Sequence, residues 1–193
     1  MKFLLTTVLA VTLLSGAATA QHLNFGIKGG MNLYNIRNDN NSTFDNSVGY
    51  HLGLLAHIHL AKQFAMQPEV VFSTQGANYS VGSTDNELNL DYVNLPLMFQ
   101  YMFDNGFRFQ AGPQVGILIN AKSKFGSANS DVKNNFSSVD LGIGAGMSYV
   151  HPPSGFGFDA RYNIGLNNIN ENGSVNSYNR GLQLGVFYLF SNK

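Results

Sequence analysis

Strict alternation of apolar and polar residues runs from Ser138 to Asn168 and constrains the fold more than any other feature. Its two arms flank His151-Pro152-Pro153-Ser154-Gly155, a combination typical of a tight turn. Successive side chains of a strand point to opposite faces, so one face of this hairpin is apolar and the other carries glycine, amides and charges. The apolar face comprises Val139, Leu141, Ile143, Ala145, Met147, Tyr149, Phe156, Phe158, Ala160, Tyr162, Ile164 and Leu166. This pattern predicts strands with lipid outside and a polar lumen inside, whereas a helix would require apolar residues at intervals near 3.6.

The same alternation recurs along the rest of the chain and predicts eight strands. They cover about Leu23–Leu33, Val48–Leu60, Phe64–Gly76, Leu90–Phe103, Phe107–Asn120, the two arms of the hairpin, and a last strand carrying Leu182 to Phe190. The long polar connections are about Tyr34 to Ser47, Ala77 to Glu87, Ala121 to Phe136 and Ile169 to Tyr178, and short turns such as Asp104-Asn105-Gly106 alternate with them. We therefore predict an all-β fold, an eight-stranded antiparallel up-and-down transmembrane β-barrel with four long outer loops and short periplasmic turns.

Aromatic residues provide a separate check on this topology. If the short turns are periplasmic, aromatic side chains should ring that rim of the barrel. The candidates are Phe25, Phe64, Tyr101, Phe103, Phe107, Phe109, Tyr149, Phe156, Phe158, Tyr188 and Phe190. Seven of the eight predicted strands supply at least one of them.

The N-terminus indicates export. Met1-Lys2, an apolar run and a small-residue end at Ala20 predict a secretory signal peptide over residues 1–20, cleaved near Ala20, and a barrel domain over 21–193. The predicted location is the outer membrane of a Gram-negative cell. With 11 basic and 11 acidic residues in the full chain, a nucleic-acid partner is not expected. The absence of cysteine excludes disulfide and thiolate chemistry.

A secreted soluble barrel of lipocalin type is the rival fold. Its alternation would be inverted, with apolar side chains inside and polar ones outside. Charged residues make up only 11% of the chain, well below the ~25% that is usual in soluble domains. The polar face here is also rich in glycine and poor in lysine and glutamate, which favours a crowded lumen.

Six charged residues are predicted to face the lumen, three of each sign. They are Lys28, Arg108 and Arg161, and Glu69, Asp140 and Asp159. Since an unpaired buried charge is costly, we expect a salt-bridged network that holds the wall together; a proton or ion path is the alternative. The sequence does not indicate which residues pair.

Three histidines raise the possibility of chemistry in the lumen. His57 and His59 share one predicted inward face and could ligate a metal only with a third or fourth ligand. His51, predicted near the outer end, could form an acid/base pair with Asp45 or Asp91. No G-x-S-x-G elbow or similar nucleophile signature occurs, so we expect no enzyme, catalytic residue, metal or cofactor.

An ordered set of short motifs resembles the PorT-like outer-membrane β-barrel family, often labelled porin-family proteins. The motifs are Asn24-Phe25-Gly26-Ile27-Lys28-Gly29-Gly30 with Asn32, Tyr92-Val93-Asn94-Leu95-Pro96-Leu97, Ala111-Gly112-Pro113, Asp140-Leu141-Gly142 with Gly144 and Gly146, Asp159 to Leu166, and Tyr188-Leu189-Phe190. The resemblance spans the mature chain. It implies an eight-stranded outer-membrane barrel, and the family's namesake is associated with protein secretion.

Two positions depart from that family. Asn94 stands where we associate an acidic residue with the family, which weakens the transfer of any lumen network. Ser191-Asn192-Lys193 follows the terminal aromatic, where assembly signals usually stop. The leading functional hypothesis is a non-enzymatic barrel with a structural or interaction role through its outer loops, accessory to secretion by resemblance. Its partners would be outer-membrane lipid and envelope or secretion proteins. The alternative is a small-solute diffusion channel.

Overall fold

The computed structural model of the chain describes residues 23–39, 45–81, 84–125, 128–171 and 175–190. Within these ranges the strands are β1 (Leu23–Asn38), β2 (Asp45–Ala61), β3 (Phe64–Val81), β4 (Thr84–Met102), β5 (Phe107–Phe125), β6 (Ala128–Asp131), β7 (Val139–Val150), β8 (Phe156–Gly165) and β9 (Ser177–Leu189), and a short 3₁₀ helix, η1, covers Lys133–Asn135. No helix among these residues is both long and apolar enough to cross a membrane. The predicted signal peptide lies outside the described residues, so its cleavage remains a prediction.

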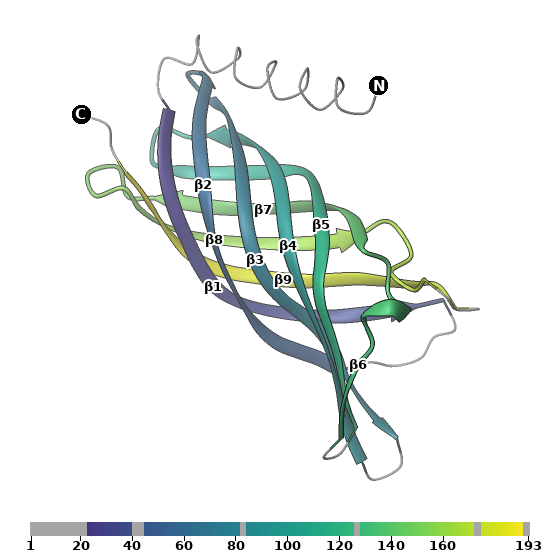
Figure 1. Cartoon of the computed structure of the whole chain (residues 1–193). Helices are drawn as coiled ribbons and strands as arrows, with labels where there is room; N and C mark the ends of the chain where they lie inside the picture. Colours follow the sequence, from purple (N-terminus) through teal and green to yellow (C-terminus); the bar gives the residue numbers. More distant parts are fainter. Residues whose placement is uncertain (1–22, 40–44, 82–83, 126–127, 172–174, 191–193) are drawn as a thin grey trace, which may run out of the picture.

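Eight of these strands close into one antiparallel ring, which confirms the predicted fold. Each strand of the ring pairs with its neighbour along the chain, β5 pairs with β7, and β9 returns to β1. The closing register places Lys28 opposite Phe187. The remaining strand, β6, stands outside the ring and pairs only with the end of β5 (Figure 1).

The two faces of the wall differ as the alternation predicts. In the hairpin of β7 and β8, Ile143 pairs with Ile164, and 47% and 44% of their surfaces remain exposed on the outside. The next pair, Gly144 and Asn163, faces inward, and Asn163 is buried. Large apolar side chains cover the outer surface of every barrel strand and polar ones are buried in the lumen. A soluble barrel has the opposite arrangement, so that alternative is wrong.

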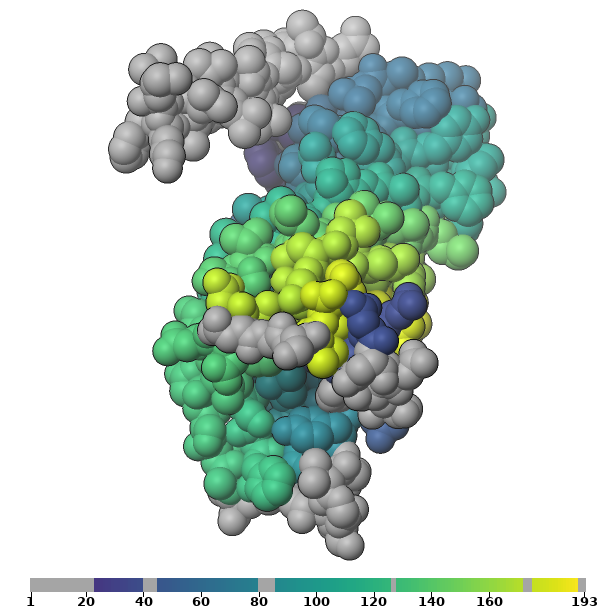
Figure 2. Space-filling view, turned by 90° about the vertical axis from the view of Figure 1, so that its right-hand side faces the viewer, coloured from purple at the N-terminus to yellow at the C-terminus, as the bar shows by residue number. Residues whose placement is uncertain are grey.

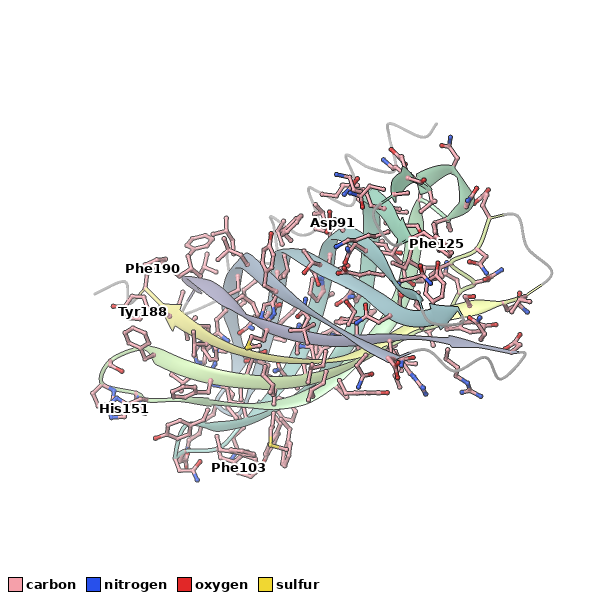
Figure 3. All side chains as sticks on the ribbon, turned by 90° about the horizontal axis from the view of Figure 1, so that it is seen from below. Asp91, Phe103, Phe125, His151, Tyr188 and Phe190 are labelled. Carbon is pink, nitrogen blue, oxygen red and sulfur yellow. The ribbon has the colours of Figure 1, made fainter. Side chains whose placement is uncertain are left out.

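Aromatic rings cluster where the short turns lie. Tyr101 stacks edge-on against Phe64 and Phe103, with ring centroids 5.2 and 5.1 Å apart. The ring of Tyr188 is tilted against Phe156 and edge-on to Phe190, with centroids 5.0 and 5.4 Å apart. Figure 3 shows Phe103, Tyr188 and Phe190 at one end of the molecule and Asp91 and Phe125 toward the other. The arrangement matches the aromatic rim predicted for the end that carries the short turns.

The short turns match their sequence signals. Gly106 adopts a φ of 90°, which favours glycine, and its N–H donates to the carbonyl of Phe103 at 3.1 Å. A side chain at this position would also meet the carbonyl oxygen of Val150. Asp104-Asn105-Gly106 therefore forms the predicted turn between β4 and β5.

At the other end, the strands run much further than predicted. Residues 34–38, 77–81, 84–87 and 121–125 were expected in polar loops, but they lie in strands. Figure 1 shows β3, β4 and β5 continuing past the ring, with β6 beside them. We call this projection, formed by residues 76–81, 84–91, 119–125 and β6, the outer arm. Its backbone groups pair between neighbouring strands, as at Tyr79 and Asn86, so polar sequence is no obstacle to strand formation there.

Candidate functional site: lumen and outer mouth

Four of the six predicted lumen charges meet at the centre of the barrel. Lys28 of β1 lies 3.3 Å from a Glu69 carboxylate oxygen and 3.2 Å from one of Asp159. Arg161 of β8 donates to both carboxylate oxygens of Glu69, from Nη2 at 2.7 Å and from Nη1 at 3.1 Å. We call Lys28, Glu69, Asp159 and Arg161 the central ion cluster. It joins β1, β3 and β8 across the lumen, and its formal charges sum to zero.

The other two predicted charges form no ion pair with this cluster among the described residues. Arg108 donates to Gln100 at 3.5 Å on the periplasmic side. Asp140 accepts a hydrogen bond of 2.8 Å from Asn179, whose side chain also contacts the Tyr92 hydroxyl at 3.3 Å. Gln100 donates in turn to Gln67 at 3.1 Å, and Gln67 donates to Glu69, so amide side chains link Arg108 to the cluster. Asp140 has no such link among the described residues, and any functional role for the six charges remains a proposal.

Amides surround the central ion cluster. Gln110 accepts from Arg161 at 3.1 Å, and Gln67 donates to Glu69 at 2.8 Å. Asn94, the departure from the PorT-like pattern, is also buried in the lumen. Charge-assisted bonds of this kind are shorter and stronger than neutral ones. The cluster is therefore hydrogen-bonded as well as ion-paired, as charges buried at this depth require.

Small residues make room for these side chains. A Cβ atom at Gly185 would lie 2.8 Å from Asp159 Oδ1 and 2.9 Å from His51 Nε2. A Cβ atom at Gly144 would lie 2.6 Å from the side-chain oxygen of Asn163. Glycine on the inward face thus reflects a crowded lumen.

His51 belongs to the interior and not to an acid/base pair at the rim. Its Nδ1 lies 2.8 Å from Asn32 Oδ1. Asn32 donates in turn to Ser73 at 3.0 Å. Asp91 instead accepts from Asn120 at 2.8 Å, and Asp45 pairs in register with Asn78 on the outer arm. The sequence placed His51 too far out because the strands extend well beyond their predicted ends.

His57 and His59 do lie together, as predicted. Their rings contact edge-on with centroids 4.6 Å apart. Among the described residues, no group of three or more histidine, aspartate or glutamate side chains is placed to hold a metal ion. The pair therefore lacks the further ligands that a metal site needs.

Buried apolar clusters lie on both sides of the central ion cluster, a feature that the sequence did not predict. On the outer side Ile36, Leu90, Tyr92, Leu118 and Ile169 are buried in one cluster with Ala77 and Ala121, which we call the outer plug. On the periplasmic side Leu55, Val150, Phe187 and Leu189 form a second buried cluster. Every second residue of β1 faces the lumen from Lys28 through Tyr34 to Ile36. Toward the outer end these inward residues change from polar to apolar, so the sequence no longer alternates between apolar and polar residues there.

Two connecting segments cover the outer plug. The Ser137 N–H donates to the Ile169 carbonyl at 2.7 Å, and the Glu171 N–H donates to the Asn135 carbonyl at 2.9 Å. Phe136 and Asn170 form an isolated bridge between the same segments. We call these two segments, residues 135–137 and 169–171, the cap. Beside the cap is a cavity of about 550 Å³ that opens at the outer mouth. Figure 2 shows a recess between the green β5–β7 connection and the yellow-green β8–β9 segment.

A closed eight-stranded wall with an apolar exterior and a polar, charged centre defines an integral outer-membrane β-barrel protein. The model of one family, described as outer membrane protein beta-barrel domain, matches residues 19–171, and the chain belongs to this family. The narrower PorT-like resemblance remains a prediction. No curated protein shows significant sequence similarity to the chain.

Solved structures with this fold include Neisserial surface protein A, which has 17% sequence identity and a TM-score of 0.57, with 88% of this chain and 100% of that chain covered. Ail, the attachment invasion locus protein of Yersinia pestis, solved with the heparin analogue sucrose octasulfate, has 16% identity and a TM-score of 0.53 at the same coverage. A major outer membrane protein from Thermus thermophilus has 16% identity and a TM-score of 0.50, again with 88% and 100% covered. At these identities the likeness concerns the fold alone.

Proposed function

We propose that this protein is a closed, non-enzymatic barrel of the outer membrane that acts as a binding protein through its outer end. The observation that carries the proposal is the filling of the lumen. The side chains of Lys28, Glu69, Asp159 and Arg161 are at most 3% exposed, and apolar clusters lie on both sides of them. A barrel of eight strands is narrow enough for side chains to fill it.

The outer arm supports an interaction role. It places strands on a rigid wall and carries exposed residues such as Phe125, 55% of whose surface is accessible. Recognition usually sits on segments held by a rigid scaffold. Ail, which shares the fold, has been solved in complex with a sulfated sugar analogue, so a barrel of this size can present a binding surface.

The non-enzymatic part of the proposal draws support from the partners of the polar groups. His51, the strongest acid/base candidate, is hydrogen-bonded to Asn32, and both are buried. General catalysis requires a group within reach of a substrate. Service to a secretion machine is the more specific form of the proposal, and it rests on the PorT-like resemblance only.

Conductance tests the closed lumen. The purified full-length protein in planar bilayers should give no stepwise current. Stepwise current that changes when Lys28 is replaced by glutamine would instead identify the diffusion channel and contradict the proposal.

In-cell crosslinking tests the binding role. A photoreactive amino acid at Phe125 of the outer arm should capture a stoichiometric envelope partner. The matched control is the same amino acid at Phe158, which is 65% exposed on the apolar outer surface. Recovery of the barrel alone from the Phe125 position, or the same products from both positions, would count against a binding role of the outer arm.

A further inference from the structure

The cavity at the outer mouth has two unlike sides. Ile36 belongs to the outer plug, and Leu88, Val132 and Phe136 pack against it, so one side of the cavity is apolar and includes an aromatic ring. The other side carries amide and hydroxyl groups. At about 550 Å³ it falls within the usual range of small-molecule sites, ~300–1,000 Å³.

Hydrogen bonds hold the polar side in place. Asn170 Nδ2 donates to the Val175 carbonyl at 2.8 Å and to Ser177 Oγ at 2.9 Å. Ser177 Oγ donates to Asn38 Oδ1 at 2.7 Å. Asn168, behind this side, accepts from the backbone N–H groups of Asn170 and Ser177 at 3.1 and 2.8 Å. A site whose groups are already ordered loses less entropy when a ligand binds.

The apolar side is fixed equally well. Backbone hydrogen bonds of the cap hold Asn135 and Phe136, since the Asn135 carbonyl accepts from Glu171 and Phe136 bridges to Asn170. Val132 N–H donates to the Ala121 carbonyl at 3.1 Å. The cavity is therefore formed before any ligand arrives.

The chemistry of the lining narrows the ligand class. The residues that line the cavity are all uncharged, so a phosphate, sulfate, carboxylate or cation would find no opposite charge there. A wholly apolar ligand would cover amides without bonding them, which is unfavourable. Sugar rings combine an apolar C–H face with hydroxyl groups that donate and accept, and amide side chains also do both.

We propose that this cavity binds a neutral sugar of about one or two rings, with the C–H face on Phe136 and the hydroxyl groups on Asn38, Asn135 and Asn170. The proposal deepens the proposed binding role by naming a ligand class for the outer mouth. The Nδ2 group of Asn38 and the side chain of Asn135 have no hydrogen-bond partner among the described residues. They supply donors and acceptors for the hydroxyl groups.

Ligand-observed NMR with the full-length protein in nanodiscs tests the site. The probes are a panel of neutral mono- and disaccharides with gluco, galacto, manno, fuco and N-acetyl configurations. Sucrose octasulfate serves as the anionic comparator, and a capped neutral tripeptide tests whether a peptide occupies the same cavity. At least one neutral sugar should bind, with a Kd on the order of 1 mM or tighter.

Matched variants locate the binding. Phe136→Leu keeps an apolar side chain but removes the ring, and Asn135→Ala removes an exposed amide; each should weaken sugar binding about three- to tenfold. Phe125→Leu and Asn129→Ala make the same changes on the outer arm, at exposed positions outside the cavity, and should leave the Kd unchanged. Circular dichroism of each variant confirms that the barrel has folded.

Three results would overturn the sugar site. The first is that no neutral sugar binds, and the second is that the pocket variants bind sugar as tightly as the wild type does. The third is that Phe136→Leu weakens binding of sucrose octasulfate or of the tripeptide but leaves binding of neutral sugars unchanged. The wider binding role is judged separately, by conductance and by crosslinking from Phe125. If crosslinking succeeds and sugar binding fails, only the sugar site is wrong.

Discussion

At the scale of single residues, Glu69 is the hub of the lumen. It accepts from Lys28, from both terminal nitrogens of Arg161 and from Gln67. Apolar clusters on both sides exclude water, so these bonds act in a medium of low dielectric constant. Removing one partner of such a pair costs much more than the pair contributes on balance.

We therefore predict that Glu69→Gln strongly destabilises the barrel. The change leaves two buried cations facing the single carboxylate of Asp159, and the cost should be about 3–5 kcal/mol. Urea unfolding of the protein in lipid bilayers measures it. Lys28→Gln combined with Glu69→Gln restores one cation to one carboxylate and should recover part of the loss. Equal stability of Glu69→Gln and wild type would show that Glu69 is not the hub.

At the scale of elements, the hairpin of β7 and β8 shows how the wall is built. The alternating side chains of both strands fall in register, so apolar residues pair outside and small or polar ones pair inside. A shift by one residue would exchange the two faces, which the bilayer and the lumen both oppose. This is why the sequence predicts which residues of this hairpin face outward, whereas the pairing of individual residues comes from the structure.

The outward direction of this hairpin can be tested by cysteine labelling. The chain has no cysteine of its own, so single cysteines report cleanly. Ile143→Cys and Ile164→Cys should not react with a water-soluble thiol reagent in intact outer membranes, because both side chains face lipid. Asn129→Cys on β6, an exposed polar position, should react readily. Free reaction at Ile143 or Ile164 would place that face in water.

At the scale of the whole molecule, the lumen consists of three layers. The outer plug lies nearest the outer mouth, the central ion cluster follows, and the cluster of Leu55, Val150, Phe187 and Leu189 lies toward the periplasm. Each layer draws on strands from different parts of the ring. Buried side chains therefore fill the lumen at more than one level along its length.

Closure at more than one level makes a distinct prediction for Ile169, which is fully buried in the outer plug. Ile169→Ala should create a cavity and cost about 2–4 kcal/mol of unfolding free energy. It should nevertheless remain electrically silent in planar bilayers, because the charged layer still closes the lumen. The matched control is Ile119→Ala on the outer surface, where 43% of the side chain is exposed and the cost should be smaller. Current through Ile169→Ala alone would show that the outer plug is the only barrier.

The sequence by itself determined the wall of this barrel. Alternation at a period of two, short turns such as Asp104-Asn105-Gly106 and the aromatic residues of one rim are local signals, because each depends on neighbours within a strand or a turn. The same alternation places Lys28, Glu69, Asp159 and Arg161 on the inward face, and their side chains are buried in the lumen.

Only the tertiary structure decided what the lumen and the outer end contain. Lys28 and Asp159 are separated by 131 positions, so their contact depends on ring closure and strand stagger, which no local pattern encodes. Arg108 and Asp140 face the same lumen at other heights and meet other partners. At the outer end apolar side chains turn inward, so the contrast between the two faces fades, and the strands continue through residues that the polar composition assigned to loops.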